Sequence, residues 1–161
     1  HIGTSLVEDD QLDYAKKIYG SGKIVLPVDN VVAAAYPEDD SAKGEVVNSD
    51  EIPEGMMGLD IGPKTAENYA KIIASAKTVF WNGPMGVSEI PAFANGTIAV
   101  CKAAAENEGA FTVIGGGDSA AAAKKLGFAS KFSHVSTGGG ASLELIQNDG
   151  HLPGIDIIED K

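Results

Sequence analysis

The strongest chemical motif in the sequence is a run of glycines that leads from a mostly apolar segment into a helix. Residues 111–114 predict a buried strand, and Gly115-Gly116-Gly117 follows directly before Asp118 and Ser119. Glycine lets backbone N–H groups approach a ligand closely. The first turn of a helix has unpaired N–H donors and a partial positive charge. Together these features favour an anion site suited to phosphate.

Each part of this motif also has a purely structural interpretation. The Asp118 carboxylate could cap the helix instead of facing a metal ion. The Ser119 hydroxyl could be solvated instead of contacting a phosphate, and the glycines could serve close packing of the helix on the strand. The residue types alone leave these alternatives open.

A second glycine run, Gly138-Gly139-Gly140, follows the short apolar segment around Val135. Thr137, just before it, is either a helix cap or a ligand-binding residue. A nicotinamide-binding fingerprint would require an acidic residue at the end of the strand that follows the first glycine run, and the sequence has none there. The P-loop motif does not occur either. The two runs therefore favour phosphate binding by glycine turns of another kind.

The elements that carry these motifs alternate between strands and helices. The hydrophobic pattern predicts helices within the first twenty residues and at 63–75, 92–107, 118–126 and 140–147, and strands at 23–27, 57–61, 78–81, 111–114 and 134–136. Successive strand–helix units predict an α/β fold, Rossmann-like, with three αβα layers and a mostly parallel sheet. Ligands bind beyond the carboxyl ends of such strands. We expect both glycine runs and Asn82 at that edge.

Composition narrows the classes of partner. The chain has 161 residues, about one domain, with 12 basic and 23 acidic side chains and a net charge of −11. Such a surface repels nucleic acid and anionic lipid, so we expect neither as a partner. One cysteine, Cys101, excludes an internal disulfide and is expected to be an inert packing residue. No apolar run is long enough to span a membrane, and no signal-peptide pattern is present, so we expect a cytoplasmic protein.

Five motifs occur together in the order found in phosphoglycerate kinases, and the chain resembles that family over its whole length. They are Leu26–Asp29, Met57–Pro63, Trp81–Gly86, Gly115–Ser119 and Ser136–Leu145. The resemblance implies that residues 1–161 are the later part of the C-terminal, nucleotide-binding domain, truncated at its N-terminal side. The N-terminal, glycerate-binding domain is then absent from this chain.

The resemblance also implies an activity. The family transfers a phosphoryl group from 1,3-bisphosphoglycerate to ADP in glycolysis, with Mg²⁺, and yields 3-phosphoglycerate and ATP. The parent enzyme is expected to be a monomer. A chain without the glycerate pocket and its cationic groups is expected to be inactive alone, because phosphoryl transfer depends on positioning and charge neutralisation.

Site residues follow by matching the family's motifs. Gly58 and Leu59 match positions in the adenine pocket, and Glu89 matches the carboxylate that holds the ribose hydroxyls. The positions matching those that face the phosphates are Asn82, Gly116, Gly117, Asp118 and Ser119, with Asp118 also the magnesium ligand. Gly117 and Gly139 match positions that take part in the transfer step, Gly139 within a loop that closes over the moving phosphoryl group.

One residue departs from the family pattern. Ser88 stands where the family usually has phenylalanine, just before the ribose glutamate, and this change removes apolar packing under the nucleotide. A free-standing nucleotide-phosphate binding module without catalysis is the alternative function. A folding or interaction fragment that binds nothing is a third. Mg-ATP binding by the isolated chain separates these last two hypotheses.

Overall fold

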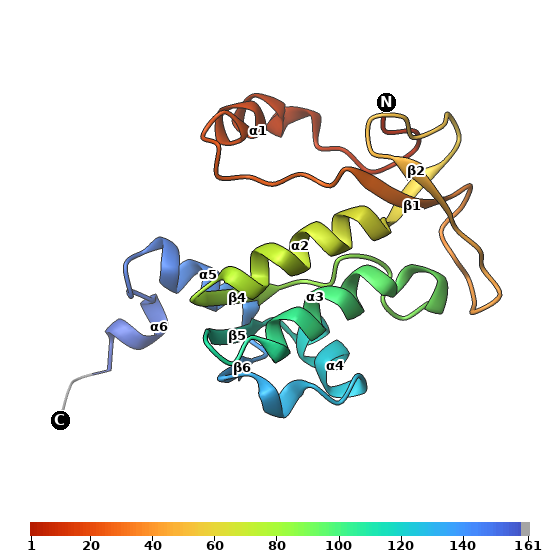
Figure 1. Cartoon of the computed structure of the whole chain (residues 1–161). Helices are drawn as coiled ribbons and strands as arrows, with labels where there is room; N and C mark the ends of the chain where they lie inside the picture. Colours follow the sequence, from red (N-terminus) through yellow and green to blue (C-terminus); the bar gives the residue numbers. More distant parts are fainter. Residues whose placement is uncertain (159–161) are drawn as a thin grey trace. The chain divides into compact units, whose positions relative to one another are not determined.

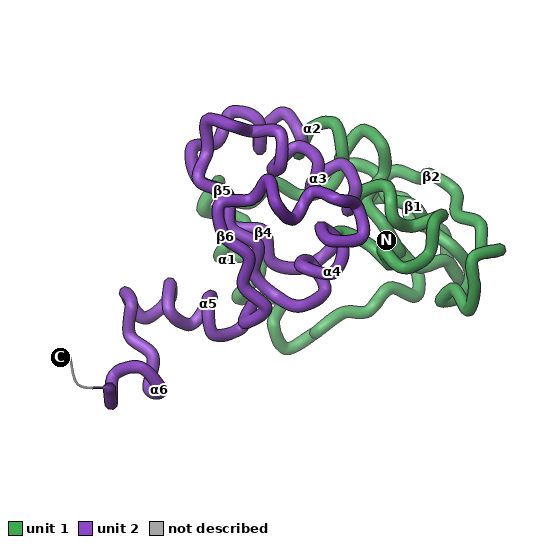
Figure 2. Tube along the Cα trace, turned by 90° about the horizontal axis from the view of Figure 1, so that it is seen from below, with its two compact units in different colours: residues 1–69, 85–96 green, residues 70–84, 97–161 purple. Residues whose placement is uncertain are grey.

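The structure, a computed structural model, describes residues 1–158 and divides them into two compact units (Figure 2). Unit 1 comprises His1–Tyr69 and Met85–Gly96, and unit 2 comprises Ala70–Pro84 and the chain from Thr97 onward. Strands and helices alternate along most of the chain (Figure 1), which confirms the expected Rossmann-like α/β class. None of the helices in residues 1–158 combines the length and apolarity needed to cross a membrane.

Unit 1 is built on an antiparallel sheet in the order β2-β1-β3. Its strands are β1 (Asp29–Ala33), β2 (Glu45–Asn48) and β3 (Met57–Ile61). The expectation that residues 57–61 continue a parallel series was wrong, because β3 pairs with β1 in the antiparallel direction. Apolar periodicity identifies a strand but carries no information about the direction of its partner.

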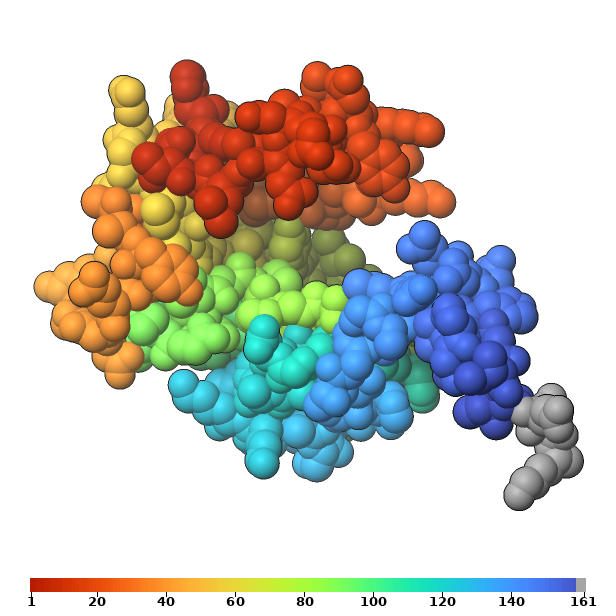
Figure 3. All heavy atoms as spheres, turned by 180° about the vertical axis from the view of Figure 1, so that it is seen from behind, coloured from red at the N-terminus to blue at the C-terminus, as the bar shows by residue number. Residues whose placement is uncertain are grey.

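Two helical segments precede this sheet. The short η1 (Asp9–Gln11) leads into α1 (Leu12–Tyr19), which confirms the helix expected within the first twenty residues. α1 buries none of its residues, and Figure 3 shows this N-terminal part (red) on the surface.

The apolar run at 23–27 forms no strand, contrary to expectation; the first strand begins instead at Asp29. The Val25 carbonyl accepts a hydrogen bond of 2.8 Å from the Tyr69 hydroxyl. Pro27 has no N–H to donate to a ladder. The run is therefore held by a side chain rather than by a neighbouring strand.

Helix α2 (Pro63–Ser75) has the predicted bounds and is capped from β1. The buried Asp29 carboxylate accepts the backbone N–H groups of Lys64 at 3.0 Å and Thr65 at 2.8 Å, and it also accepts the Thr65 hydroxyl. Burial acts to raise the pKa of Asp29, but these hydrogen bonds and the Lys64 charge outweigh it, so the pKa is lowered. The carboxylate thus holds the start of α2 against the sheet.

Unit 2 contains a parallel sheet in the order β4-β5-β6. Buried side chains fill this unit, among them Ile114 and Cys101, and the Trp81 ring stacks on Phe132 with centroids 6.1 Å apart. The short helix α6 was not expected from the sequence. The elements are β4 (Thr78–Asn82), α3 (Asn95–Glu106, mostly in unit 2), β5 (Phe111–Gly115), α4 (Gly117–Lys125), η3 (Ala129–Lys131), β6 (His134–Ser136), α5 (Gly139–Gln147) and α6 (Pro153–Asp156).

Candidate functional site

The three strands of unit 2 end level with one another. In the parallel register Asn82 lies beside Gly115, and Gly115 lies beside Ser136. Helices α4 and α5 begin two and three residues after the last residues of β5 and β6, respectively. Two helix N-termini therefore start from the same edge of the sheet, where parallel α/β proteins bind ligands.

The two glycine runs meet around Asn82. A Cβ atom on Gly116 would lie 3.0 Å from the Asn82 side-chain oxygen, and one on Gly139 would lie 2.9 Å from the Gly116 Cα and N atoms. Gly116 also has a φ of 93°, which side-chain-bearing residues rarely adopt. The close approach of the two turns thus requires glycine at both positions. This geometry confirms the expectation that both runs and Asn82 share one edge.

The structure removes one interpretation of Asp118. The N-cap of α4 is Gly116, and no side chain caps this helix, so the capping role considered for Asp118 is wrong. Asp118 is exposed in the first turn, and within residues 1–158 no hydrogen bond or ion pair engages its carboxylate. The positive end of the helix dipole lies at this turn, and the carboxylate is free for a ligand.

Ser119 has a role that the residue type did not indicate. Its side chain is fully buried, and its hydroxyl accepts a hydrogen bond of 2.7 Å from the Gly83 N–H. The solvated alternative is therefore wrong. The bond ties the first turn of α4 to the turn that follows Asn82.

Helix α5 begins in a similar way. Its N-cap is Gly138 and no side chain caps it, so the capping role considered for Thr137 is also wrong. The Gly138 N–H donates to the Ser136 hydroxyl at 3.2 Å. As in α4, the first backbone N–H groups are not engaged by a capping side chain, which suits them to an anion.

The donor set fits a magnesium ion carried by a phosphate. The described part of the chain, residues 1–158, has no group of three or more His, Cys, Asp or Glu side chains arranged to hold a metal. Mg²⁺ keeps several waters and is commonly bound by one or two carboxylates together with substrate phosphates. The exposed Asp118 carboxylate, in the first turn of α4, is a ligand of the type that such an ion takes, and a phosphate and water would have to supply the others.

The residues expected to contact the nucleoside belong to unit 1 rather than unit 2. Gly58 and Leu59 lie in β3, and Leu59 is buried. Glu89 is exposed and has no bonded partner among residues 1–158. The Val87 N–H donates to the Leu59 carbonyl at 2.9 Å, so the segment that carries Glu89 is joined directly to β3.

Sequence reasoning missed two buried carboxylates in unit 1. Asp29 caps α2, as described above, and Asp60 in β3 is only 3% exposed. The signal that could have identified them is an acidic residue inside an otherwise apolar strand. Such a residue needs backbone or side-chain donors around it, because an unpaired buried charge is costly.

Known proteins resemble this chain closely. Residues 1–149 match the family model described as "Phosphoglycerate kinase". The phosphoglycerate kinase of Macrococcus caseolyticus is 55% identical over 162 residues, which cover 99% of this chain and 40% of that protein. The phosphoglycerate kinase of Fusobacterium nucleatum is 55% identical over 163 residues, with 100% and 40% covered.

Solved structures give the same answer. The phosphoglycerate kinase of Coxiella burnetii superimposes with a TM-score of 0.86 at 40% identity, covering 98% of this chain and 40% of that one. That of Pyrococcus horikoshii has a TM-score of 0.75 at 35% identity, with 91% and 36% covered. A parallel α/β unit with glycine-led helix N-termini and this degree of identity define the class: the chain belongs to the phosphoglycerate kinase family. It spans about two fifths of the length of the relatives it matches.

Proposed function

We propose that this chain is the later part of the nucleotide-binding domain of a phosphoglycerate kinase. The intact enzyme would move a phosphoryl group from the acyl phosphate of 1,3-bisphosphoglycerate to the β-phosphate of ADP, releasing 3-phosphoglycerate and ATP. The observation that carries this proposal is the meeting of the glycine turns that lead into α4 and α5 around Asn82, beside the free Asp118 carboxylate. Family membership supports the reaction class.

Each residue of the site has a distinct role in this proposal. The backbone N–H groups at Gly116, Gly117 and Gly139 bind phosphate oxygens, since the helix dipoles favour negative charge there. Gly117 and Gly139 face the group in transit. Asn82 orients the phosphates, and Ser119 fixes the turn at Gly83.

Magnesium bound with the nucleotide would neutralise phosphate charge, and Asp118 is the residue that would hold it. Gly58 and Leu59 form one wall for the adenine base. Glu89 accepts hydrogen bonds from the ribose hydroxyls. The co-substrate is therefore ATP or ADP with Mg²⁺.

The glycerate substrate requires a part of the enzyme that this chain does not contain. The relatives are about two and a half times as long as the match. We infer that the chain alone does not transfer phosphoryl groups and binds Mg-ATP weakly. We also propose a monomeric, cytoplasmic parent enzyme without nucleic-acid or membrane partners, in keeping with the net charge of −11 and a single cysteine, which is free and buried.

The decisive experiment replaces Asp118 with alanine in an intact phosphoglycerate kinase that contains this sequence. Because Asp118 caps nothing and loses only its favourable interaction with the helix dipole, the free energy of unfolding should fall by no more than about 1 kcal/mol. Turnover at saturating Mg-ATP should fall about a hundredfold, or about 2.7 kcal/mol of barrier. Asp13→Ala, which removes an exposed acid from the first turn of α1, is the matched control. Turnover of the Asp118 variant within threefold of wild type would contradict the assigned role.

A binding measurement tests the alternative function. If the isolated chain binds Mg-ATP tightly, and with the same affinity as the intact enzyme, the chain is a self-sufficient phosphate-binding module. If the chain transfers phosphoryl groups at the rate of an ordinary kinase, the fragment interpretation is wrong.

A further inference from the structure

The proposed function assigns no role to one buried carboxylate, that of Asp60. The Asp60 carboxylate, in β3, is 3% exposed and accepts two backbone N–H groups, from Ile61 and from Gly96, each at 2.8 Å. Burial raises the pKa of Asp60, and the two hydrogen bonds do not offset that effect. A buried carboxylate of this kind is weak evidence for stability, because an apolar residue often fills such a space at lower cost. What the carboxylate does in this structure is hold the backbone that donates to it at Gly96.

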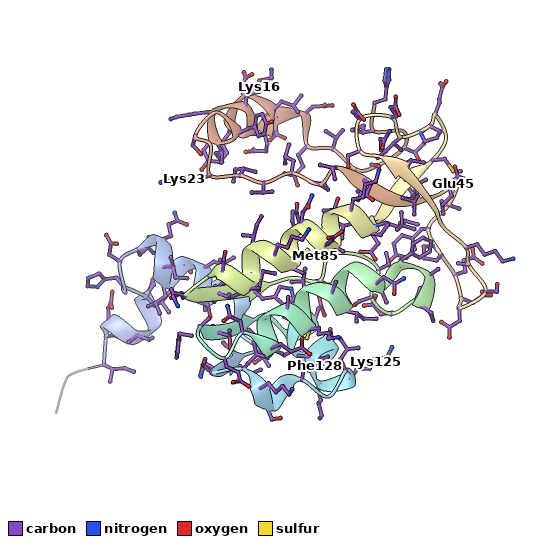
Figure 4. The ribbon with its side chains drawn as sticks, in the orientation of Figure 1. Lys16, Lys23, Glu45, Met85, Lys125 and Phe128 are labelled. Atoms are coloured by element: carbon purple, nitrogen blue, oxygen red, sulfur yellow. The ribbon has the colours of Figure 1, made fainter. Side chains whose placement is uncertain are left out.

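Asp60 contacts both ends of one segment, Met85–Gly96, which belongs to unit 1 (Met85 is labelled in Figure 4). At one end, a Cβ atom on Gly86 would lie 2.5 Å from an Asp60 carboxylate oxygen and 2.6 Å from the Leu59 carbonyl oxygen. At the other end, the Gly96 N–H donates to the carboxylate. A Cβ atom on Gly96 would also collide with it. Two glycines thus let the segment close onto a single side chain.

The rest of the segment is fixed between these ends. The Val87 N–H donates to the Leu59 carbonyl at 2.9 Å, and Phe93 is fully buried. Glu89 lies near the middle of the segment and is exposed, as is Pro91. The position of Glu89 relative to β3 is therefore set by contacts at Leu59 and Asp60, on the strand that carries the expected adenine wall.

We propose that Asp60 is a positioning residue for nucleoside binding, which fixes the 85–96 segment so that Glu89 and the Gly58–Leu59 wall are held in one geometry. The inference rests on the proposed function, because it gives these three residues the base and the ribose. Asp60 touches no ligand itself. Its loss disorders the nucleoside site and leaves the phosphate turn of unit 2 unchanged.

The test compares Asp60→Asn with Asp29→Asn in the intact enzyme. Both variants replace a buried carboxylate of unit 1, which accepts backbone N–H groups, by its isosteric amide, but Asp29 bonds to Lys64 and Thr65 instead of the 85–96 segment. The Asp60 variant should weaken adenosine binding, measured by calorimetry, at least tenfold. It should raise the KM for ADP similarly, with kcat within threefold. The Asp29 variant should change adenosine affinity less than twofold. Equal adenosine affinities in the two variants would overturn the proposal.

A third variant separates failure of this inference from failure of the proposed function. If wild type binds adenosine and Glu89→Gln weakens that binding, the proposed function stands whatever Asp60→Asn does. If wild type binds no adenosine and Glu89→Gln changes no kinetic constant, the proposed function itself fails.

A second variant tests the inference if Asp60→Asn does not fold. Gly86→Ala displaces the segment and keeps the carboxylate, and it should weaken adenosine binding at least tenfold as well. Gly109→Ala, where a Cβ meets only an ordinary contact at 3.7 Å, is its control. Unchanged adenosine affinity in Gly86→Ala would refute the inference.

Discussion

Adjacent glycines at the start of α5 should respond to alanine in opposite ways. Gly139 is buried, and an added Cβ would meet the Gly116 Cα and N atoms at 2.9 Å as well as the Asn82 side-chain oxygen. The neighbouring Gly140 is exposed, and an added Cβ there would meet nothing within 4 Å. Both residues lie in the helix, so helix propensity acts on both and only the packing differs.

The magnitudes follow from these contacts. Gly139→Ala must separate two backbone turns by about 0.5 Å or more to restore ordinary van der Waals distances, and overpacking of this kind costs about 1–3 kcal/mol. Gly140→Ala gains about 0.5–1 kcal/mol, since alanine loses less conformational entropy in a helix. Because the gain in helix propensity applies at both positions, the two variants should differ by the overpacking cost alone, about 1–3 kcal/mol in the free energy of unfolding. In a protein of 150–250 residues that is a difference of about 2–12 °C in Tm.

Urea unfolding followed by circular dichroism measures this difference. The m-value should stay constant, because neither change alters the surface exposed on unfolding. Gly139→Ala should lower the midpoint and Gly140→Ala should raise it. If the Gly139 variant is as stable as wild type, the two turns are not packed as described. If both variants lose equal stability, the loss belongs to the glycine run as a whole and not to the contact between Gly139 and Gly116.

Four further predictions concern other parts of the chain. Asp29 has a lowered pKa, so the stability it contributes is present above about pH 4 and is lost as the pH falls through its folded-state pKa. In urea titrations over a range of pH, Asp29→Asn should lower the free energy of unfolding at pH 7 and leave it unchanged at the acid end of the range. Asp60 has a raised pKa, so its contribution is present at low pH and falls as the pH rises through that value, and Asp60→Asn should remove this decline from the same series. Cys101 is fully buried and burial raises the pKa of its thiol to about 11, so a disulfide reagent at pH 8 should label it at least about a hundredfold faster in urea than in buffer. Ser88→Phe should tighten ADP binding by the intact enzyme about fivefold, or about 1 kcal/mol from partial burial of a ring, as calorimetry would show; an unchanged Kd would mean that no packing is lost at this position.

Local signals in the sequence predicted much of unit 2 and its candidate site. Pro63 begins α2, and glycine runs lie at or just after the ends of β5 and β6. The order of strand, turn and helix could therefore be predicted from residue types alone. The meeting of Gly116 with Gly139 followed from a general rule, because parallel strands end at a common edge. The comparison with known proteins then placed the chain in the family that its five motifs had indicated.

Long-range partners could not be predicted in the same way. The direction in which β3 pairs depends on β1, which is about 30 residues away. The capping roles of Asp118 and Thr137 were wrong, since glycine backbone occupies the N-cap at both helices. The Asp29 and Asp60 carboxylates satisfy donors 35 and 36 residues further along the chain, a relation that no local window contains.

The aromatic side chains make the two units spectroscopically distinct. The one tryptophan of the chain, Trp81, lies in unit 2 at the residue before Asn82, where it is 4% exposed and stacked on Phe132. All four tyrosines lie in unit 1, at positions 14, 19, 36 and 69. Selective excitation of the indole therefore follows the unfolding of unit 2 without a label, and tyrosine absorbance follows unit 1.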